Sequence, residues 1–135
     1  TGFGHALDVR NLQAMREAIG PDDELSCDAN QVLGVEQAIA FARDVAPLNL
    51  AWFEEPIRVD APAEHWRRLA AASSTPLAGG ENLQGAQFDA ACADKVLHVI
   101  QPDITKWGGV TGSLHIARAA VAAANATART SSAAA

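Results

Sequence analysis

Four acidic residues recur along the sequence at nearly even intervals, each at the end of a short apolar segment. They are Asp28, Glu54, Glu81 and Asp103, and the intervals between them are 26, 27 and 22 residues. If the apolar segments are neighbouring strands of a parallel sheet, these acids gather at one edge, where ligands bind in α/β proteins. Carboxylates gathered in one cleft repel each other unless a cation is present. Oxygen-only ligands suit a hard divalent ion, magnesium first. The alternative is that each acid caps a helix or fills a turn.

The segments between these acids predict the elements that would position them. Apolar periodicity predicts helices over residues 7–19, 34–45, 62–72 and 86–93, and another from about residue 110. Short apolar or β-branched runs predict strands over residues 24–30, 49–53, 75–80 and 96–100. Strands that alternate with helices of this length indicate an α/β fold of about four parallel strands joined by crossover helices. Residues 1–124 would form this domain, and residues 125–135 a low-complexity tail.

Strand alternation predicts which side chains share a face with the acids. Asn30 would lie on the face of Asp28, and Trp52 would lie on the face of Glu54. The two sequence neighbours of Glu54 would then point toward the helix layer or the rim of the sheet.

Composition narrows the classes of protein and partner. A chain of 135 residues that is 49% apolar and 19% charged is typical of one globular domain. A formal net charge of −6 argues against nucleic acid or an anionic membrane as a partner. The apolar runs are too short to span a bilayer. Two isolated cysteines, Cys27 and Cys92, fit neither a disulfide framework nor a zinc pattern, which favours a cytoplasmic protein.

Four linked motifs resemble those of the enolase superfamily. They are Ser-Cys-Asp-Ala-Asn-Gln at 26–31, Trp-Phe-Glu-Glu-Pro at 52–56, Gly-Glu-Asn at 80–82, and Gln-Pro-Asp-Ile-Thr at 101–105 followed by Gly-Gly at 108–109. Within the superfamily they are most similar to the mandelate racemase and acid-sugar dehydratase branch. The resemblance covers residues 1–120 and implies part of a TIM (β/α)8 barrel, the C-terminal barrel domain of the mandelate racemase and muconate-lactonizing enzymes.

The resemblance also implies a role for each motif residue. Asp28, Glu54 and Glu81 would be the three magnesium ligands on consecutive strands. Asn30 would lie at the substrate edge, and Asp103 would orient a histidine base supplied by the next strand.

The activity implied is removal of the proton α to a carboxylate, in a racemase or in an acid-sugar dehydratase acting on a small-molecule sugar acid. A cation on the carboxylate oxygens would stabilise the charge that develops. The family's lysine base lies on a strand before Thr1, and its histidine lies on a strand after the helix around Ile116. Of the two lysines present, Lys95 precedes its strand and Lys106 is expected to be solvated at the rim. We therefore expect a fragment of such an enzyme that is inactive alone.

Two other readings remain open. The first is a non-catalytic half-barrel that forms homo-oligomers through the open edges of its strands, at residues 26–28 and 96–100. The second is a doubly wound binding domain with an acidic edge, which is weaker because no phosphate-binding loop is present.

Overall fold

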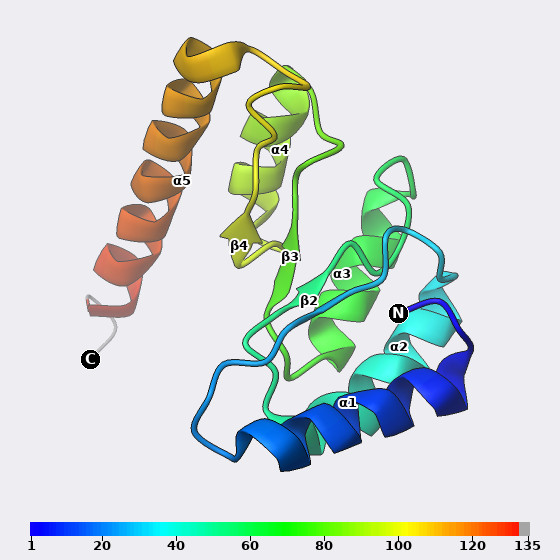
Figure 1. The fold of residues 1–135 in the computed structure, drawn as a ribbon. Helices are drawn as coiled ribbons and strands as arrows, with labels where there is room; N and C mark the ends of the chain where they lie inside the picture. Colours follow the sequence, from blue (N-terminus) through cyan, green and yellow to red (C-terminus); the bar gives the residue numbers. More distant parts are fainter. Residues whose placement is uncertain (133–135) are drawn as a thin grey trace. The chain divides into compact units, whose positions relative to one another are not determined.

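A computed structural model describes residues 1–132, with side chains described up to residue 124. Helices and short strands alternate along this part of the chain (Figure 1). The elements are α1 (His5–Ile19), β1 (Cys27–Asp28), α2 (Val35–Val45), the 3-10 turn η1 (Ala46–Leu48), β2 (Phe53–Glu54), α3 (Ala63–Ala72), β3 (Leu77–Gly79), α4 (Ala86–Asp94), β4 (Val99–Ile100) and α5 (Gly109–Ser132). Every predicted helix and strand is present.

The four strands form one sheet in the order β1-β2-β3-β4. β1 pairs with β2 and β2 pairs with β3, both in parallel, and Asp28 lies opposite Glu54. At the other side of β3, the Gln101 N–H donates to Gly79 O at 3.0 Å. The fold is therefore α/β, with four parallel strands joined by crossover helices, as predicted.

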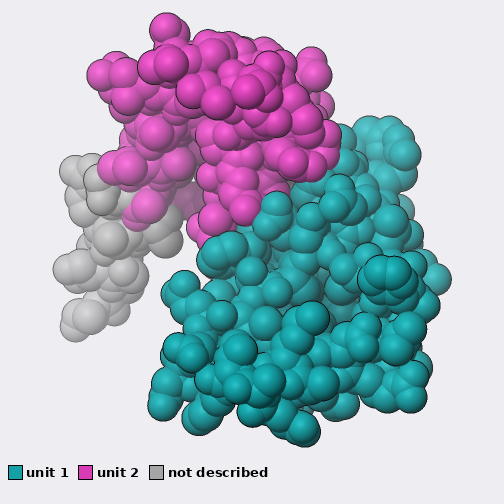
Figure 2. Space-filling model, viewed as in Figure 1, with its two compact units in different colours: residues 1–78 teal, residues 79–135 magenta. Residues whose placement is uncertain are grey.

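The chain divides into two compact units, Thr1–Ala78 and Gly79–Ala135 (Figure 2). The core of the first unit lies where the apolar stripe of α2 meets β2. Phe41 of α2 and Phe53 of β2 are fully buried, and their ring centroids are 5.3 Å apart. Leu69 of α3 and Leu77 of β3 are also fully buried. The apolar residues of α2 recur at helical spacing, which explains why the sequence periodicity predicted this helix.

The second unit has a smaller core, formed where α4 packs against α5 (Figure 1). Phe88 and Cys92 of α4 and Ile116 of α5 are buried there. Trp107 lies before α5, and its ring centroid is 5.8 Å from that of Phe88.

One arginine ties the end of α1 to the turns around it. The Arg16 guanidinium donates to Leu48 O at 2.9 Å, to Gly20 O at 3.0 Å, to Asn49 O at 3.2 Å and to Asp23 O. The sequence did not predict this cluster, because the bonds to Leu48 and Asn49 join distant segments. It also did not predict the 3-10 turn η1, which is closed locally by the Asn49 N–H to Ala46 O bond at 3.3 Å.

The C-terminal helix crosses the boundary expected at residues 124 and 125. α5 continues to Ser132, so the segment expected to be a tail is helical that far, and residues 133–135 lie outside the described part. Within the described residues, no helix is both long and apolar enough to traverse a bilayer.

Candidate functional site

Asp28 and Glu54 end two neighbouring parallel strands and lie opposite each other in the register. Backbone hydrogen bonds join the two strands on both sides of these acids. The Ala51 N–H donates to Leu25 O at 2.8 Å, and the Ala29 N–H donates to Glu54 O at 3.0 Å. Because parallel strands present their carboxyl ends at one edge, these two acids share an edge in the first unit.

The Asp28 carboxylate is held by the residue two positions further on. Its Oδ1 accepts the Asn30 N–H at 2.7 Å, and its Oδ2 accepts from Asn30 Nδ2 at 2.8 Å. Asn30 has a φ of 45°, a left-handed conformation that asparagine adopts more readily than most residues. The two side chains therefore lie on the same side, as expected, but a turn at Asn30 rather than an extended strand brings them together. The role of Asn30 at the substrate edge stays a prediction.

Glu54 is oriented by Trp52. The indole Nε1–H donates to Glu54 Oε2 at 3.1 Å, so both residues lie on one face of β2. Phe53 between them points the other way, into the core against Phe41. This alternation is the one expected from the sequence.

Gln31 joins the loop after β1 to the loop after β2. Its backbone N–H donates to Glu55 O at 2.8 Å, and its Nε2 donates to Glu55 Oε2 at 3.2 Å. Its Oε1 accepts the Val59 N–H at 2.8 Å. Sequence reasoning missed this link, since alternation assigned Glu55 only to the helix layer or the rim.

Glu81 follows β3 in the second unit, immediately after a glycine that packs against a neighbouring segment. Gly80 has a φ of 136°, and a Cβ there would lie 2.9 Å from Gln101 N. The Glu81 carboxylate accepts from Asn82 Nδ2 at 3.1 Å. The close approach of Gly80 thus sets where Glu81 leaves the sheet.

The Asp103 carboxylate, like that of Asp28, accepts two hydrogen bonds from the residue two positions further along the chain. Its Oδ1 accepts the Thr105 N–H at 2.8 Å and the Thr105 hydroxyl at 2.7 Å. The hydroxyl, then the backbone N–H, hold the pKa of Asp103 below its ordinary value. A carboxylate kept ionised in this way could orient a histidine imidazole by accepting its N–H.

Lys106 lies between two of the predicted site carboxylates, rather than simply in solvent. Its Nζ is 3.6 Å from Glu81 Oε2, 3.9 Å from Asp103 Oδ2 and 3.3 Å from Asn82 Oδ1. The side chain is 45% exposed, so the expectation of a rim position holds, but its ammonium also balances the charge of Glu81 and Asp103.

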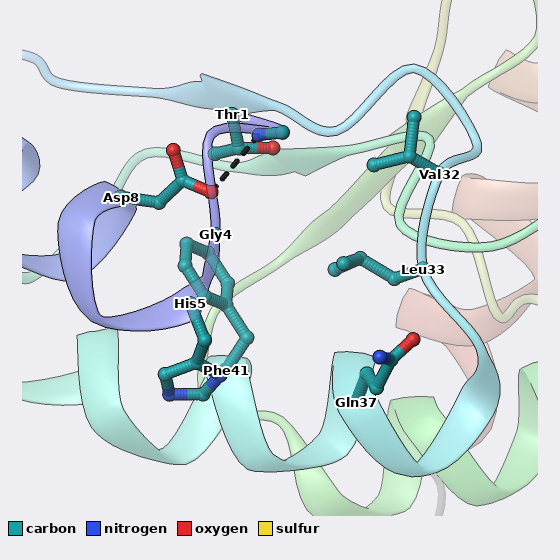
Figure 3. A pocket seen from close by; sticks show the side chains of 9 residues that line it. Thr1, Gly4, His5, Asp8, Val32, Leu33, Gln37 and Phe41 are labelled. Carbon is teal, nitrogen blue, oxygen red and sulfur yellow. Dashed lines mark hydrogen bonds between the residues drawn. The ribbon is translucent and has the colours of Figure 1, made fainter.

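Two of the histidines border pockets, and His5 also has an acidic partner. His5 Nε2 lies 2.6 Å from Asp44 Oδ2, and the His5 ring packs edge-on against Phe41 beside a pocket of about 230 Å³ (Figure 3). Asp8 borders the same pocket and accepts the Gly2 N–H at 2.9 Å. In the second unit, His98 borders a mainly apolar pocket with residues of α4 and α5, as expected of a residue facing the helix layer.

The three predicted metal ligands come from two different units of the chain. Among residues 1–132, no three His, Cys, Asp or Glu side chains form a group able to hold a metal ion. Asp28 and Glu54 belong to the first unit and Glu81 to the second. Their donor chemistry fits magnesium, because all three offer carboxylate oxygens and the hydrogen bonds described leave lone pairs on each. Their convergence on one ion stays a prediction.

Comparison with known proteins decides the family. A family model described as enolase C-terminal domain-like matches residues 1–131. The chain belongs to this family. D-galactarolactone cycloisomerase from Agrobacterium fabrum is 39% identical over 110 residues, which cover 80% of this chain and 29% of the relative.

Solved structures of enolase C-terminal domain-like proteins agree. A mandelate racemase/muconate lactonizing enzyme from Bordetella bronchiseptica has a TM-score of 0.89 and 48% identity, covering 92% of this chain and 34% of that one. L-Talarate dehydratase from Polaromonas, solved with Mg and L-glucarate, has a TM-score of 0.84 and 32% identity, covering 90% and 34%. The chain thus has the fold of part of a (β/α)8 barrel, as predicted, and spans about a third of the length of these relatives.

Proposed function

We propose that this chain is the central part of a magnesium-dependent enzyme that removes the α-proton of a carboxylate substrate, as an acid-sugar dehydratase or a racemase. The observation that carries the proposal is the parallel register of Asp28 with Glu54 at the carboxyl edge of the sheet. Relatives that are dehydratases and cycloisomerases of sugar acids support the substrate class. The solved relative with magnesium and L-glucarate supports the choice of cation.

In this proposal the described hydrogen bonds prepare the carboxylates for their roles. Asp28, Glu54 and Glu81 would hold the cation, with Asn30 and Trp52 fixing the orientation of the first two carboxylates. When bound, the cation would stabilise negative charge on the substrate carboxylate. Asp103 would accept the N–H of a histidine, fixing the ring nitrogen that takes up or returns the proton.

The resemblance assigns the lysine and histidine bases to strands outside this sequence. We propose that the 135-residue chain alone does not exchange the α-proton. Incubation with magnesium and a panel of sugar acids in heavy water, followed by proton NMR, should show no deuterium at the α-carbon. Deuterium incorporation would prove that the groups present here suffice.

Magnesium binding can be tested on the chain itself. Glu54→Gln should abolish magnesium uptake measured by isothermal titration calorimetry, because the amide replaces a charged ligand oxygen. Glu64→Gln, at an exposed site in the first turn of α3, is the matched control and should bind as the parent chain does. Absence of uptake by the parent chain, or equal uptake by both variants, would contradict the metal assignment.

A second candidate function is self-association as a non-catalytic half-barrel. Several large apolar side chains are exposed, among them Phe3 at 79% and Met15 on α1 at 52%. Such side chains favour burial against a second surface. Sedimentation analysis would support this candidate by a defined dimer and oppose it by a single monomeric species.

A further inference from the structure

The side chain of Gln31 spans the two loops that follow the proposed ligands of the first unit. Asp28 lies three residues before Gln31, and Glu54 immediately precedes Glu55. The Gln31 amide group donates to the Glu55 carboxylate at 3.2 Å and accepts the Val59 N–H at 2.8 Å. Together with the Gln31 N–H to Glu55 O bond at 2.8 Å, these contacts fasten one loop to the other.

The two joined residues are held in an unusual backbone conformation. Gln31 has a φ of 63° and Glu55 a φ of 37°, a region that non-glycine residues seldom occupy. Such conformations persist where surrounding contacts over-determine them, and they cluster at functional sites. Here the contacts include the three hydrogen bonds of Gln31 and the bond from the Glu55 N–H to Ala78 O at 3.0 Å.

Because Glu55 is buried, its contact with Gln31 requires a side chain that can donate a hydrogen bond. Glu55 is only 3% exposed, and a buried carboxylate requires hydrogen-bond donors in place of water. Gln31 supplies one such donor from its side chain, while its carbonyl oxygen satisfies the Val59 N–H. An amide can do both at once, because it carries a donor and an acceptor on one planar group.

We propose that Gln31 is a positioning residue that fixes the separation of the Asp28 and Glu54 carboxylates. The inference rests on the proposed function, in which both carboxylates bind one divalent cation. Ligand oxygens must lie within a narrow range of distances from a magnesium ion, so a loop that shifts one carboxylate weakens binding. Gln31 contacts neither carboxylate in the described hydrogen bonds and acts through the two loops.

The test compares Gln31 with Gln37, a glutamine in the first turn of α2. Gln31→Met removes the amide with little change in size. Gln37→Met is the matched control, because Gln37 Oε1 also accepts a backbone N–H, from Gly34 at 2.9 Å, but does so at the N-terminus of α2 and joins no second loop. We expect Gln31→Met to weaken magnesium affinity about 10- to 100-fold, the range typical for partners that orient metal ligands, and Gln37→Met to leave it unchanged.

A rescue variant separates hydrogen bonding from bulk. Gln31→Glu places a carboxylate against Glu55 and should weaken magnesium affinity as Gln31→Met does. Adding Glu55→Gln restores one donor and one acceptor with their roles exchanged, so affinity should largely recover. Failure of the double variant to recover would overturn the proposal.

A readout on the magnesium-free chain distinguishes failure of this inference from failure of the proposed function. Carboxyl carbon NMR signals of Asp28 and Glu54 should shift in Gln31→Met and stay in place in Gln37→Met. If the parent chain binds no magnesium, the proposed function fails, and these signals alone decide whether Gln31 positions the carboxylates. Unmoved signals, or equal loss of magnesium affinity in both methionine variants, would show that Gln31 has only a general structural role.

Discussion

At the scale of single residues, two predicted site aspartates are held by the same local device. Asp28 accepts two hydrogen bonds from Asn30, and Asp103 accepts two from Thr105. In each pair one donor is the backbone N–H and the other is a side-chain group two residues further along. Each carboxylate therefore has a fixed orientation before any ligand arrives, and the pKa of Asp103 is lowered by its two hydrogen bonds.

Removal of the Thr105 hydroxyl should raise the pKa of Asp103. Thr105→Val keeps the size of the side chain and the backbone donor but removes the largest cause of the lowered pKa. The change is measured by following the Asp103 carboxyl carbon through an acid titration by NMR. Thr111→Val, at an exposed position of α5, is the control, and an Asp103 titration identical in both variants would contradict the prediction.

The sign of the associated pH dependence follows from the lowered pKa. The ionised Asp103 carboxylate favours the folded state above the ordinary aspartate pKa, and this contribution disappears as the pH falls through the lowered value. Thr105→Val should make the chain less sensitive to acid in this range, and the contribution is small because Asp103 is partly exposed to water.

At the scale of the elements, periodicity predicted what depends on local pattern. The apolar stripe of α2 and the β-branched run of β4 correctly predicted a helix and a strand. The close approach of Gly80 to Gln101 leaves no periodic pattern in the sequence and was not predicted. The Gln31–Glu55 link was missed because strand alternation assumes an extended backbone, and the φ of Glu55 departs from it. The ammonium of Lys106 was assigned to solvent because the contacts of a long flexible side chain leave no periodic pattern.

Gly80→Ala should disrupt the junction between β3 and the segment containing Gln101. The added Cβ would lie 2.9 Å from Gln101 N, and the φ of 136° is itself nearly exclusive to glycine. We expect the free energy of unfolding to fall by well over about 1 kcal/mol, measured by urea denaturation.

Gly109→Ala provides a control at a positive-φ glycine that has no close contact. Gly109 has a φ of 56° with open space around its Cα, so this variant should lose only about 1 kcal/mol, the cost of a left-handed conformation. Equal losses in the two alanine variants would show that the contact with Gln101 contributes nothing.

At the scale of the whole molecule, the chain is an acidic α/β protein of the enolase C-terminal domain-like family. It spans about a third of the length of its relatives and divides into two compact units, each with its own buried aromatic residues. The order of motifs along the sequence predicted this architecture, because each motif marks the end of one strand. The convergence of the predicted metal ligands stays a prediction, because it depends on tertiary contacts that a strand-by-strand pattern does not specify.

Stability of the folded chain should decline in alkali because of Cys27. Burial raises the pKa of the Cys27 thiol to about 12 from 9.0, so the unfolded chain releases this proton at lower pH than the folded chain. Between these values the free energy of unfolding should fall by up to about 1.4 kcal/mol per pH unit.

The Cys27→Ala variant isolates this effect from other groups that titrate in alkali. Urea denaturation of both chains across the same alkaline range should show a shallower decline in the variant. Parallel curves would indicate that Cys27 ionises as readily in the folded chain as in the unfolded one.

The guanidinium of Arg16 donates to four carbonyl oxygens at the end of α1. A trypsin-like protease must take an arginine side chain into its specificity pocket and straighten the peptide on either side. While the helix and the four hydrogen bonds are intact, the Arg16 side chain cannot enter that pocket and the peptide around it cannot straighten. Cleavage after Arg16 should therefore proceed only as fast as the end of α1 unfolds locally. The cleavage rate would then measure the rate of this local unfolding.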